Sequence, residues 1–122
     1  MSIANLPYVL TQTPGISLVQ AATRAASMMD PLRLRHDDGD LFAEVYFFRE
    51  HILHAHVNGL DGVRAFAALQ LCNLRYLSDA GIWPARCTIV ATWDAACHEA
   101  DLLRRRPPEL WRTDDEATER LG

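Results

Sequence analysis

The sequence predicts an α+β domain in which an antiparallel sheet of three or four strands is packed by two or three helices. Three apolar-rich runs follow one another between residues 31 and 57 with turn residues between them, which is typical of an antiparallel meander. Apolar residues at helical spacing precede and follow these runs. The 122 residues suffice for one core. We therefore expect an irregular segment at 1–15, a single domain at 16–106 and a C-terminal tail at 107–122.

The first helix is predicted to begin after Ser17. Ser17 has the character of an N-cap, and Gln20 three residues later completes a capping box. The pair Asp30-Pro31 ends this helix, because a residue before proline is pushed out of the α region. Its apolar stripe is Leu18, Ala21, Ala22, Ala25, Met28 and Met29.

Asp38-Gly39 is predicted to form the first hairpin turn, since a two-residue type I′ turn needs positive φ at its central positions. This turn would place Leu34 opposite Ala43 and Arg33 opposite Glu44. Directly opposed residues share a face of the sheet. We therefore expect an ion pair between Arg33 and Glu44.

Arg49-Glu50 is the simplest second turn. It pairs Phe48 with His51 and places His54 opposite Val45. A slip of one residue at this turn would exchange the two faces of the third strand. With the simple register, the core face collects Leu32, Leu34, Leu41, Ala43, Val45, Phe47, Ile52, His54 and His56.

The opposite face is too aromatic to be left wholly in water, and such patches mark interaction sites. We expect a homodimer that forms through this face. Two alternatives stay open, namely coverage within one chain by the helix at Asp94 with the Trp111 segment, or a slipped register. The candidate interface consists of Arg33, Arg35, Phe42, Glu44, Tyr46, Phe48, His51, Leu53 and Val57.

After the strands, Asn58-Gly59 is predicted to be a turn, and Gly59 or Asp61 to start a second helix. The β-branched content of Cys87–Trp93 predicts a fourth strand. Asp94 is expected to cap a last helix that runs to Arg106. The buried stripe of the second helix is Val63, Phe66, Ala67, Leu69 and Leu74.

Composition limits the partners and the compartment. The net charge is −4 and the chain contains no lysine, so we expect no nucleic-acid binding, which needs a basic surface. The three cysteines have no CxxC spacing, which favours reduced thiols in a cytoplasmic protein. No apolar run approaches the roughly 20 residues of a membrane span.

The histidines offer the main alternative function. His51, His54 and His56 could belong to a small metal- or ligand-binding protein, because imidazole is a common ligand. Strand alternation separates His51 from the other two, whereas a zinc site needs about four ligands, or three and a water. We expect structural histidines, no metal and no cofactor. The sequence carries neither a nucleophile motif nor a phosphate-binding loop, so we expect no enzyme.

Two short sequence motifs resemble those of the PATAN-type domain family, also called domain of unknown function 4388. The first motif comprises Phe47, Ile52, Leu53, His54 and Ala55, and the second comprises Gly62, Arg64, Ala65 and Phe66. Arg49-Glu50 stands where that family has an Asp-Gly turn. The resemblance covers about residues 16–106 and implies a bacterial signalling or scaffold module without catalysis, which binds an unidentified protein partner. It gives structural roles to Phe47, His54, Ala55, Gly62 and Ala65.

Overall fold

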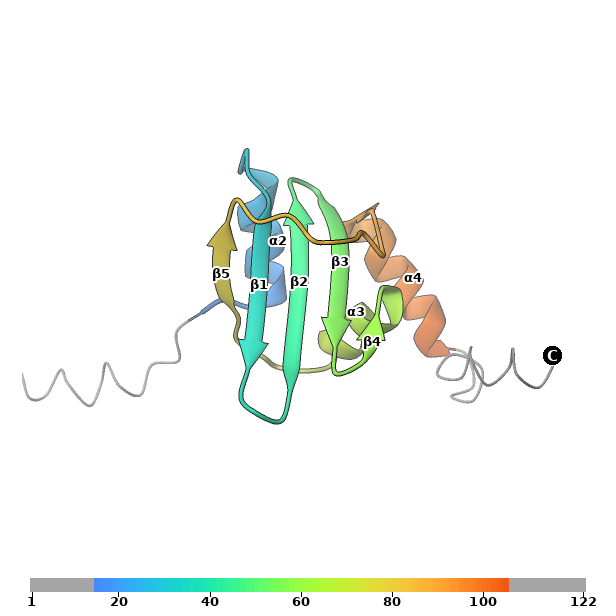
Figure 1. Ribbon diagram of the computed structural model, residues 1–122. Helices are drawn as coiled ribbons and strands as arrows, with labels where there is room; N and C mark the ends of the chain where they lie inside the picture. Colours follow the sequence, from blue (N-terminus) through green and yellow to red (C-terminus); the bar gives the residue numbers. More distant parts are fainter. Residues whose placement is uncertain (1–14, 106–122) are drawn as a thin grey trace, which may run out of the picture.

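A computed structural model describes residues 15–105 of the chain, so the predicted tail at 107–122 and most of the predicted N-terminal segment lie outside the described part. Figure 1 shows the three described helices behind an open sheet, with the connection from β5 to β6 in front of it. We call these two sides the core face and the front face. In chain order the elements are α2 (Leu18–Ala26), β1 (Leu32–Asp37), β2 (Phe42–Phe48), β3 (His51–Val57), β4 (Leu60–Asp61), α3 (Val63–Gln70), β5 (Leu77–Ala80), β6 (Ala91–Thr92) and α4 (Trp93–Arg105).

The predicted α+β class with an antiparallel sheet is confirmed. In the described residues the strand order is β4-β3-β2-β1-β5, and β6 pairs with the other end of β3. The sheet therefore has more strands than the three or four predicted. The prediction missed β5 because Leu77–Ala80 contains no β-branched or aromatic residue.

The predicted capping box at the start of α2 is confirmed. The Ser17 hydroxyl accepts a hydrogen bond from the N–H of Gln20 at 3.1 Å, and the Gln20 side-chain oxygen accepts one from the N–H of Ser17 at 2.8 Å. The helix ends at Ala26, four residues before the predicted end at Asp30, and leaves Met29 exposed. Its buried residues are Leu18, Ala21 and Ala25.

The predicted two-residue turn at Asp38-Gly39 is wrong. Asp37 pairs with Phe42, so four residues lie between β1 and β2. The Asp38 carboxylate accepts hydrogen bonds from the N–H groups of Asp40 and Leu41, at 3.0 and 2.8 Å, which stabilises this wider loop. The β1–β2 register is thereby shifted by two residues, which leaves the faces of β1 and β2 as predicted.

The shift changes the partner of Arg33. Arg33 lies opposite Tyr46 and forms an ion pair with Asp79 of β5 at 2.9 Å, so the predicted pair with Glu44 is wrong. Glu44 instead lies opposite Arg35, with 3.8 Å between their charged atoms. The hydrogen bond from Arg33 to Asp79 raises the pKa of the guanidinium and ties β1 to the edge strand.

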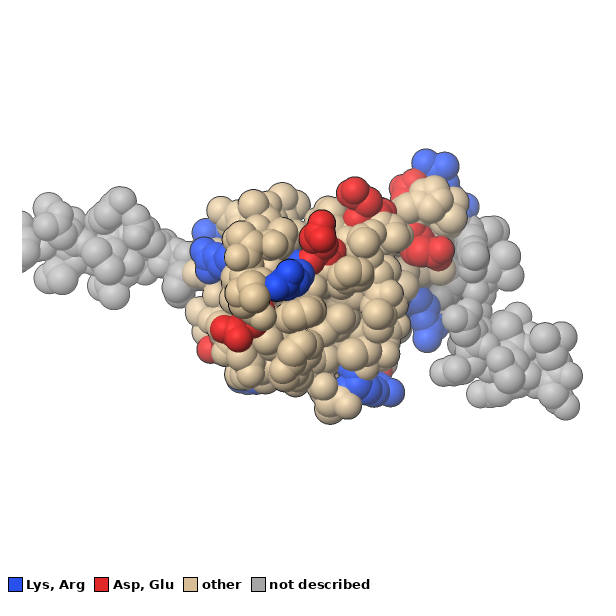
Figure 2. Space-filling view, turned by 90° about the horizontal axis from the view of Figure 1, so that it is seen from above, with Lys and Arg blue, Asp and Glu red and all other residues tan. Residues whose placement is uncertain are grey.

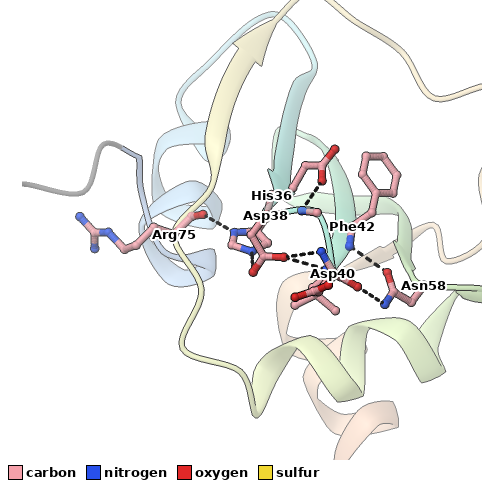
Figure 3. A network of polar contacts seen from close by, with 9 residues as sticks. His36, Asp38, Asp40, Phe42, Asn58 and Arg75 are labelled. Atoms are coloured by element: carbon pink, nitrogen blue, oxygen red, sulfur yellow. Dashed lines mark hydrogen bonds and ion pairs between the residues drawn. The ribbon is translucent and has the colours of Figure 1, made fainter.

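A polar network at the lower end of the sheet holds three loops together (Figure 3). The Asn58 side chain accepts a hydrogen bond from the N–H of Phe42 at 2.8 Å and donates one to the carbonyl oxygen of Asp40 at 3.0 Å. His36 Nδ1 lies 3.2 Å from the carbonyl oxygen of Arg75. The network therefore fixes the loop from β1 to β2 against the turn after β3, where Asn58-Gly59 was predicted.

A β-bulge in β3 changes the predicted faces of this strand. Phe48 pairs with His51 across the Arg49-Glu50 turn as predicted, but Leu53 has no partner and His54 lies opposite Tyr46. Beyond the bulge, the predicted positions of His54 and His56 on the core face are therefore wrong. Their places are taken by Ala55, opposite Val45, and by Val57, opposite Ala43.

The C-terminal half differs in its boundaries. Gly62 is the N-cap of α3, which therefore begins after both predicted starts, Gly59 and Asp61. Cys87–Trp93 is not a full strand, because only Ala91–Thr92 pairs with β3. The Thr92 hydroxyl accepts a hydrogen bond from the N–H of Ala95 at 3.2 Å and so caps α4, where Asp94 was predicted to do so.

Aromatic contacts join the helices to the sheet. The ring of Trp93 stacks on Phe47 with 6.2 Å between centroids and meets the edge of Phe66 at 5.4 Å. Phe47 comes from β2 and Phe66 from α3, so Trp93 fixes the start of α4 against both. The largest fully buried side chains are Tyr76, Phe47, Phe66, Leu34, Ile52, Leu69 and Val45.

Substitution of Gly15 by alanine is expected to destabilise the domain more than the same change at Gly59. Both glycines have positive φ, +108° and +91°, which costs an alanine about 1 kcal/mol. A Cβ at Gly15 would also lie 2.3 Å from the carbonyl oxygen of Tyr76, whereas a Cβ at Gly59 meets open space. Urea unfolding measures both losses, and equal losses would contradict the close approach at Gly15.

Candidate protein-binding site

The connection from β5 to β6 covers the upper part of the front face. We call residues 81–90 the strap, and Figure 1 shows it crossing in front of β1, β2 and β3. The N–H of Gly81 donates a hydrogen bond to the carbonyl oxygen of Pro31, and that of Ile89 donates one to the carbonyl oxygen of Leu53, at 2.9 and 3.1 Å. The strap is therefore fixed at both ends by backbone hydrogen bonds.

The strap buries part of the predicted interface. Tyr46 and Leu53 are buried within one chain, and Val57 lies on the core face because of the bulge. These three side chains are not available to a partner. The remaining candidates lie on the front face and are exposed or half-buried: Arg33, Arg35, Phe42, Glu44, Phe48 and His51.

His54 is buried, as predicted, but under the strap rather than on the core face. It is 8 % exposed, and its Nδ1 forms a 2.8 Å hydrogen bond with the hydroxyl of Thr88. Burial lowers the pKa of His54, so the neutral imidazole is the form that the fold favours. His54 therefore joins the strap to β3.

A second polar contact lies beside it. Asp61 accepts a hydrogen bond from His56 Nδ1 at 2.8 Å, and its other oxygen pairs with Arg86 of the strap. The hydrogen bond from His56 is the main cause that lowers the pKa of Asp61. Together, His54 and Asp61 give the strap two side-chain attachments to the sheet.

The histidines do not converge on one point. His51 is exposed at the top of β3 opposite Thr92, whereas His54 and His56 bind Thr88 and Asp61. Within residues 15–105, no group of three or more His, Cys, Asp or Glu side chains could hold a metal ion.

Burial raises the pKa of the Cys97 thiol, and Gln70 donates a hydrogen bond to its sulfur at 3.3 Å. A raised pKa leaves little thiolate at neutral pH, which disfavours nucleophilic use. Cys72 and Cys87 are free and exposed.

The upper end of the domain carries a group of exposed or half-buried apolar side chains around an arginine. The Trp83 ring lies 4.9 Å from the Phe48 ring, and the Arg49 guanidinium lies 5.9 Å from the same Phe48 ring. Arg49 also reaches the sulfur of Met29, with 2.9 Å between Nη2 and Sδ. Trp83 is 57 % exposed and Met29 is 75 % exposed. We call Met29, Phe48, Arg49 and Trp83 the exposed cluster.

Figure 2 shows this end of the molecule from above. Uncharged atoms cover most of the described surface in that view, and the charged side chains stand in separate small groups rather than in one patch. Arg49 and Glu50 occupy the β2–β3 turn at this end. The described surface in that view thus carries few charged side chains, and depletion of charged residues is typical of the cores of protein interfaces.

Of the exposed cluster, the sequence predicted only Phe48 as an interface residue. Met29 was assigned to the helix stripe, but α2 ends before it. Trp83 lies between Gly81 and Pro84, and its place over Phe48 depends on the path of the strap, which local sequence does not determine. Arg49 was predicted only as a residue of the turn, where the structure gives it a φ of +55°.

No protein-family model matches the chain, and no match was found among curated proteins or solved structures. No helix in the described part of the chain combines the length and the apolar content that a membrane crossing requires.

His54→Ala is expected to cost about 1–3 kcal/mol, because it leaves the hydroxyl of Thr88 without its partner under the strap. It should also change the pH dependence of stability. Since burial lowers the pKa of His54, the unfolded chain binds the proton first, and stability falls as the pH drops below about 6.5 toward the lower pKa of the folded state.

Urea unfolding between pH 8 and pH 5 measures this effect. The wild-type protein should lose stability over that range, and His54→Ala should lose less. His98→Ala, a change at an exposed histidine of α4, should keep the wild-type slope. If the free energy of unfolding depends equally on pH in the wild type and in His54→Ala, protonation of His54 does not affect stability, and the prediction is wrong.

Proposed function

We propose that the protein is a non-catalytic protein–protein interaction module that forms a homodimer through the exposed cluster. The observation that carries this proposal is the exposed Trp83, which lies against Phe48 beside Arg49 and Met29. Tryptophan, methionine and arginine are enriched at protein interfaces, and binding energy concentrates at tryptophan and arginine. The proposal accords with the scaffold role that the resemblance to the PATAN-type domain implies.

The apolar area of the cluster provides the driving force. An aromatic side chain buries about 150–250 Å² when it is fully covered, and apolar area contributes about 25 cal/mol per Å². Trp83 and Met29 are mostly exposed in one chain, so a partner can still cover most of their surface. Phe48 holds the indole of Trp83 in contact with the sheet, which reduces the entropy lost on binding.

The turn between β2 and β3 favours a second copy as the partner. Arg49 and Glu50 are adjacent, exposed and oppositely charged. A two-fold axis places residue i of one protomer against residue j of the other, and j against i. Two copies that meet at this turn can therefore form two reciprocal Arg49–Glu50 pairs around the aromatic centre, which fixes their orientation.

A non-catalytic role is supported by the use made of the polar side chains. The described groups whose pKa values are lowered by the fold include His54 and Asp61, and each of them is bonded to the strap. Burial lowers the pKa of His54 and the hydrogen bond from His56 lowers the pKa of Asp61, so both shifts follow from the packing of the strap and β3.

Trp83→Glu is expected to abolish the dimer, because it places a charge at the apolar centre. Sedimentation velocity at micromolar concentration should give a dimer for the wild type and a monomer for Trp83→Glu. The matched control is Leu71→Glu at the end of α3, where the side chain is 74 % exposed but lies outside the cluster, and it should remain dimeric. A wild-type monomer, or a Trp83→Glu dimer as tight as the wild type, would refute the proposal.

Charge reversal tests the reciprocal pairs separately. Arg49→Glu should weaken the dimer, since two like charges then face two Glu50 side chains across the axis. Arg49→Glu combined with Glu50→Arg should restore it, because the pairs re-form with the charges exchanged. Failure of the double variant to regain affinity, with the fold intact by circular dichroism, would exclude the reciprocal pairing.

A further inference from the structure

The helices on the core face are divided into two groups with a groove between them. Helix α2 packs on β1 and β2, whereas α3 and α4 pack on each other and on β3. Two adjoining cavities of about 390 and 240 Å³ lie along α2, and Val19 and Trp93 line both of them. We call these two cavities together the helix groove.

The helix groove has a mixed lining. Its upper cavity is also lined by Thr23, Arg49, Glu50, Thr92 and Asp94, and its apolar side chains are held in place. Leu18 and Leu69 line its lower part, and Ala22 and Phe47 line its upper part. Trp93 is fixed by its ring contacts with Phe47 and with the buried Phe66. Val19, on the rim, is 63 % exposed. A groove whose apolar side chains are fixed in place, beside a few polar ones, suits a peptide segment that is apolar and uncharged.

We infer that residues 1–14 of the same chain occupy the helix groove. This segment contains no charged side chain, and its apolar residues include Ile3, Leu6, Tyr8, Val9 and Leu10. The other terminal segment, residues 106–122, carries eight charged side chains. Desolvation of those charges against the apolar side chains of the groove would be costly, so the N-terminal segment is the better occupant.

The point of attachment places the segment at the groove. Ile16 and Tyr76 exchange two backbone hydrogen bonds of 2.9 Å, and Tyr76 lines the lower cavity together with Ser17. Gly15, where the described part of the chain begins, therefore lies at the lower end of the groove. The close approach of Gly15 to the carbonyl oxygen of Tyr76 holds this junction in one conformation.

The reach of the segment is sufficient. Fourteen extended residues span up to about 46–50 Å, whereas the nine residues of α2 are about 14 Å long. Tethering of this kind raises the effective concentration to about the millimolar range, which favours the same chain over a second copy. Pro7 and Pro14 disfavour a helix, so the occupant is an extended segment.

Nuclear Overhauser effects in the full-length chain test this inference. The methyl groups of Leu6, Val9 and Leu10 should show contacts to the ring of Trp93 and to the methyl groups of Val19. Leu6→Asp combined with Leu10→Asp should abolish the contacts of Val9. The matched control, Asn5→Asp with Thr11→Asp, adds the same charge at polar positions and should keep them.

A change in the groove gives an independent test. Val19→Asp leaves the segment intact and, because Val19 is exposed, should leave the domain folded, yet it should abolish the contacts of the segment to Trp93. Absence of these contacts in the wild type would overturn the inference.

Samples that mix isotope-labelled and unlabelled chains distinguish the two possible sources of the segment. Contacts that arise between chains would assign the groove to a second copy and would likewise overturn the inference. Trp83→Glu, which is expected to be monomeric, shows whether docking of the segment depends on the proposed dimer. If the segment docks within one chain, its contacts to Trp93 and Val19 should be the same in this variant as in the wild type.

Discussion

The bulge at Leu53 is the constraint on which the two faces of the sheet depend. With uninterrupted pairing, β3 would place two imidazoles opposite Val45 and Ala43, in a core without polar partners for them. The unpaired residue turns His54 and His56 to the front face and brings Ala55 and Val57 into the core. One extra residue thus decides whether the helices pack on apolar or on polar side chains.

The same bulge accounts for the strap. Tyr46, Leu53 and His54 lie on the front face and are buried there, although the described helices all pack on the other side. The strap supplies the missing cover, with Thr88 as the partner of His54. Its first residues then carry the indole of Trp83 over Phe48, so the exposed cluster results from how the front face is closed.

Local signals predicted the local features. The capping box at Ser17 and the pairing of Phe48 with His51 needed only neighbouring residues, and both are as predicted. The loop at Asp38 was missed because its carboxylate competes for backbone N–H groups. The bulge was missed because the prediction uses the simplest register, regular pairing after a two-residue turn, with a slip of one residue as the open alternative. Trp83 could not be placed, since the strap and β5 are defined only by distant partners.

The strand order also determines how the chain assembles. β1, β2 and β3 are neighbours in sequence and in space, so their pairing closes only short loops. Arg33 and Asp79, which join β1 to β5, are 46 residues apart, and closing that loop costs more entropy. We therefore expect the meander to form first and β5 with the strap to be added later. The surface that carries Trp83 then belongs to a part of the domain that can open locally while the meander stays folded.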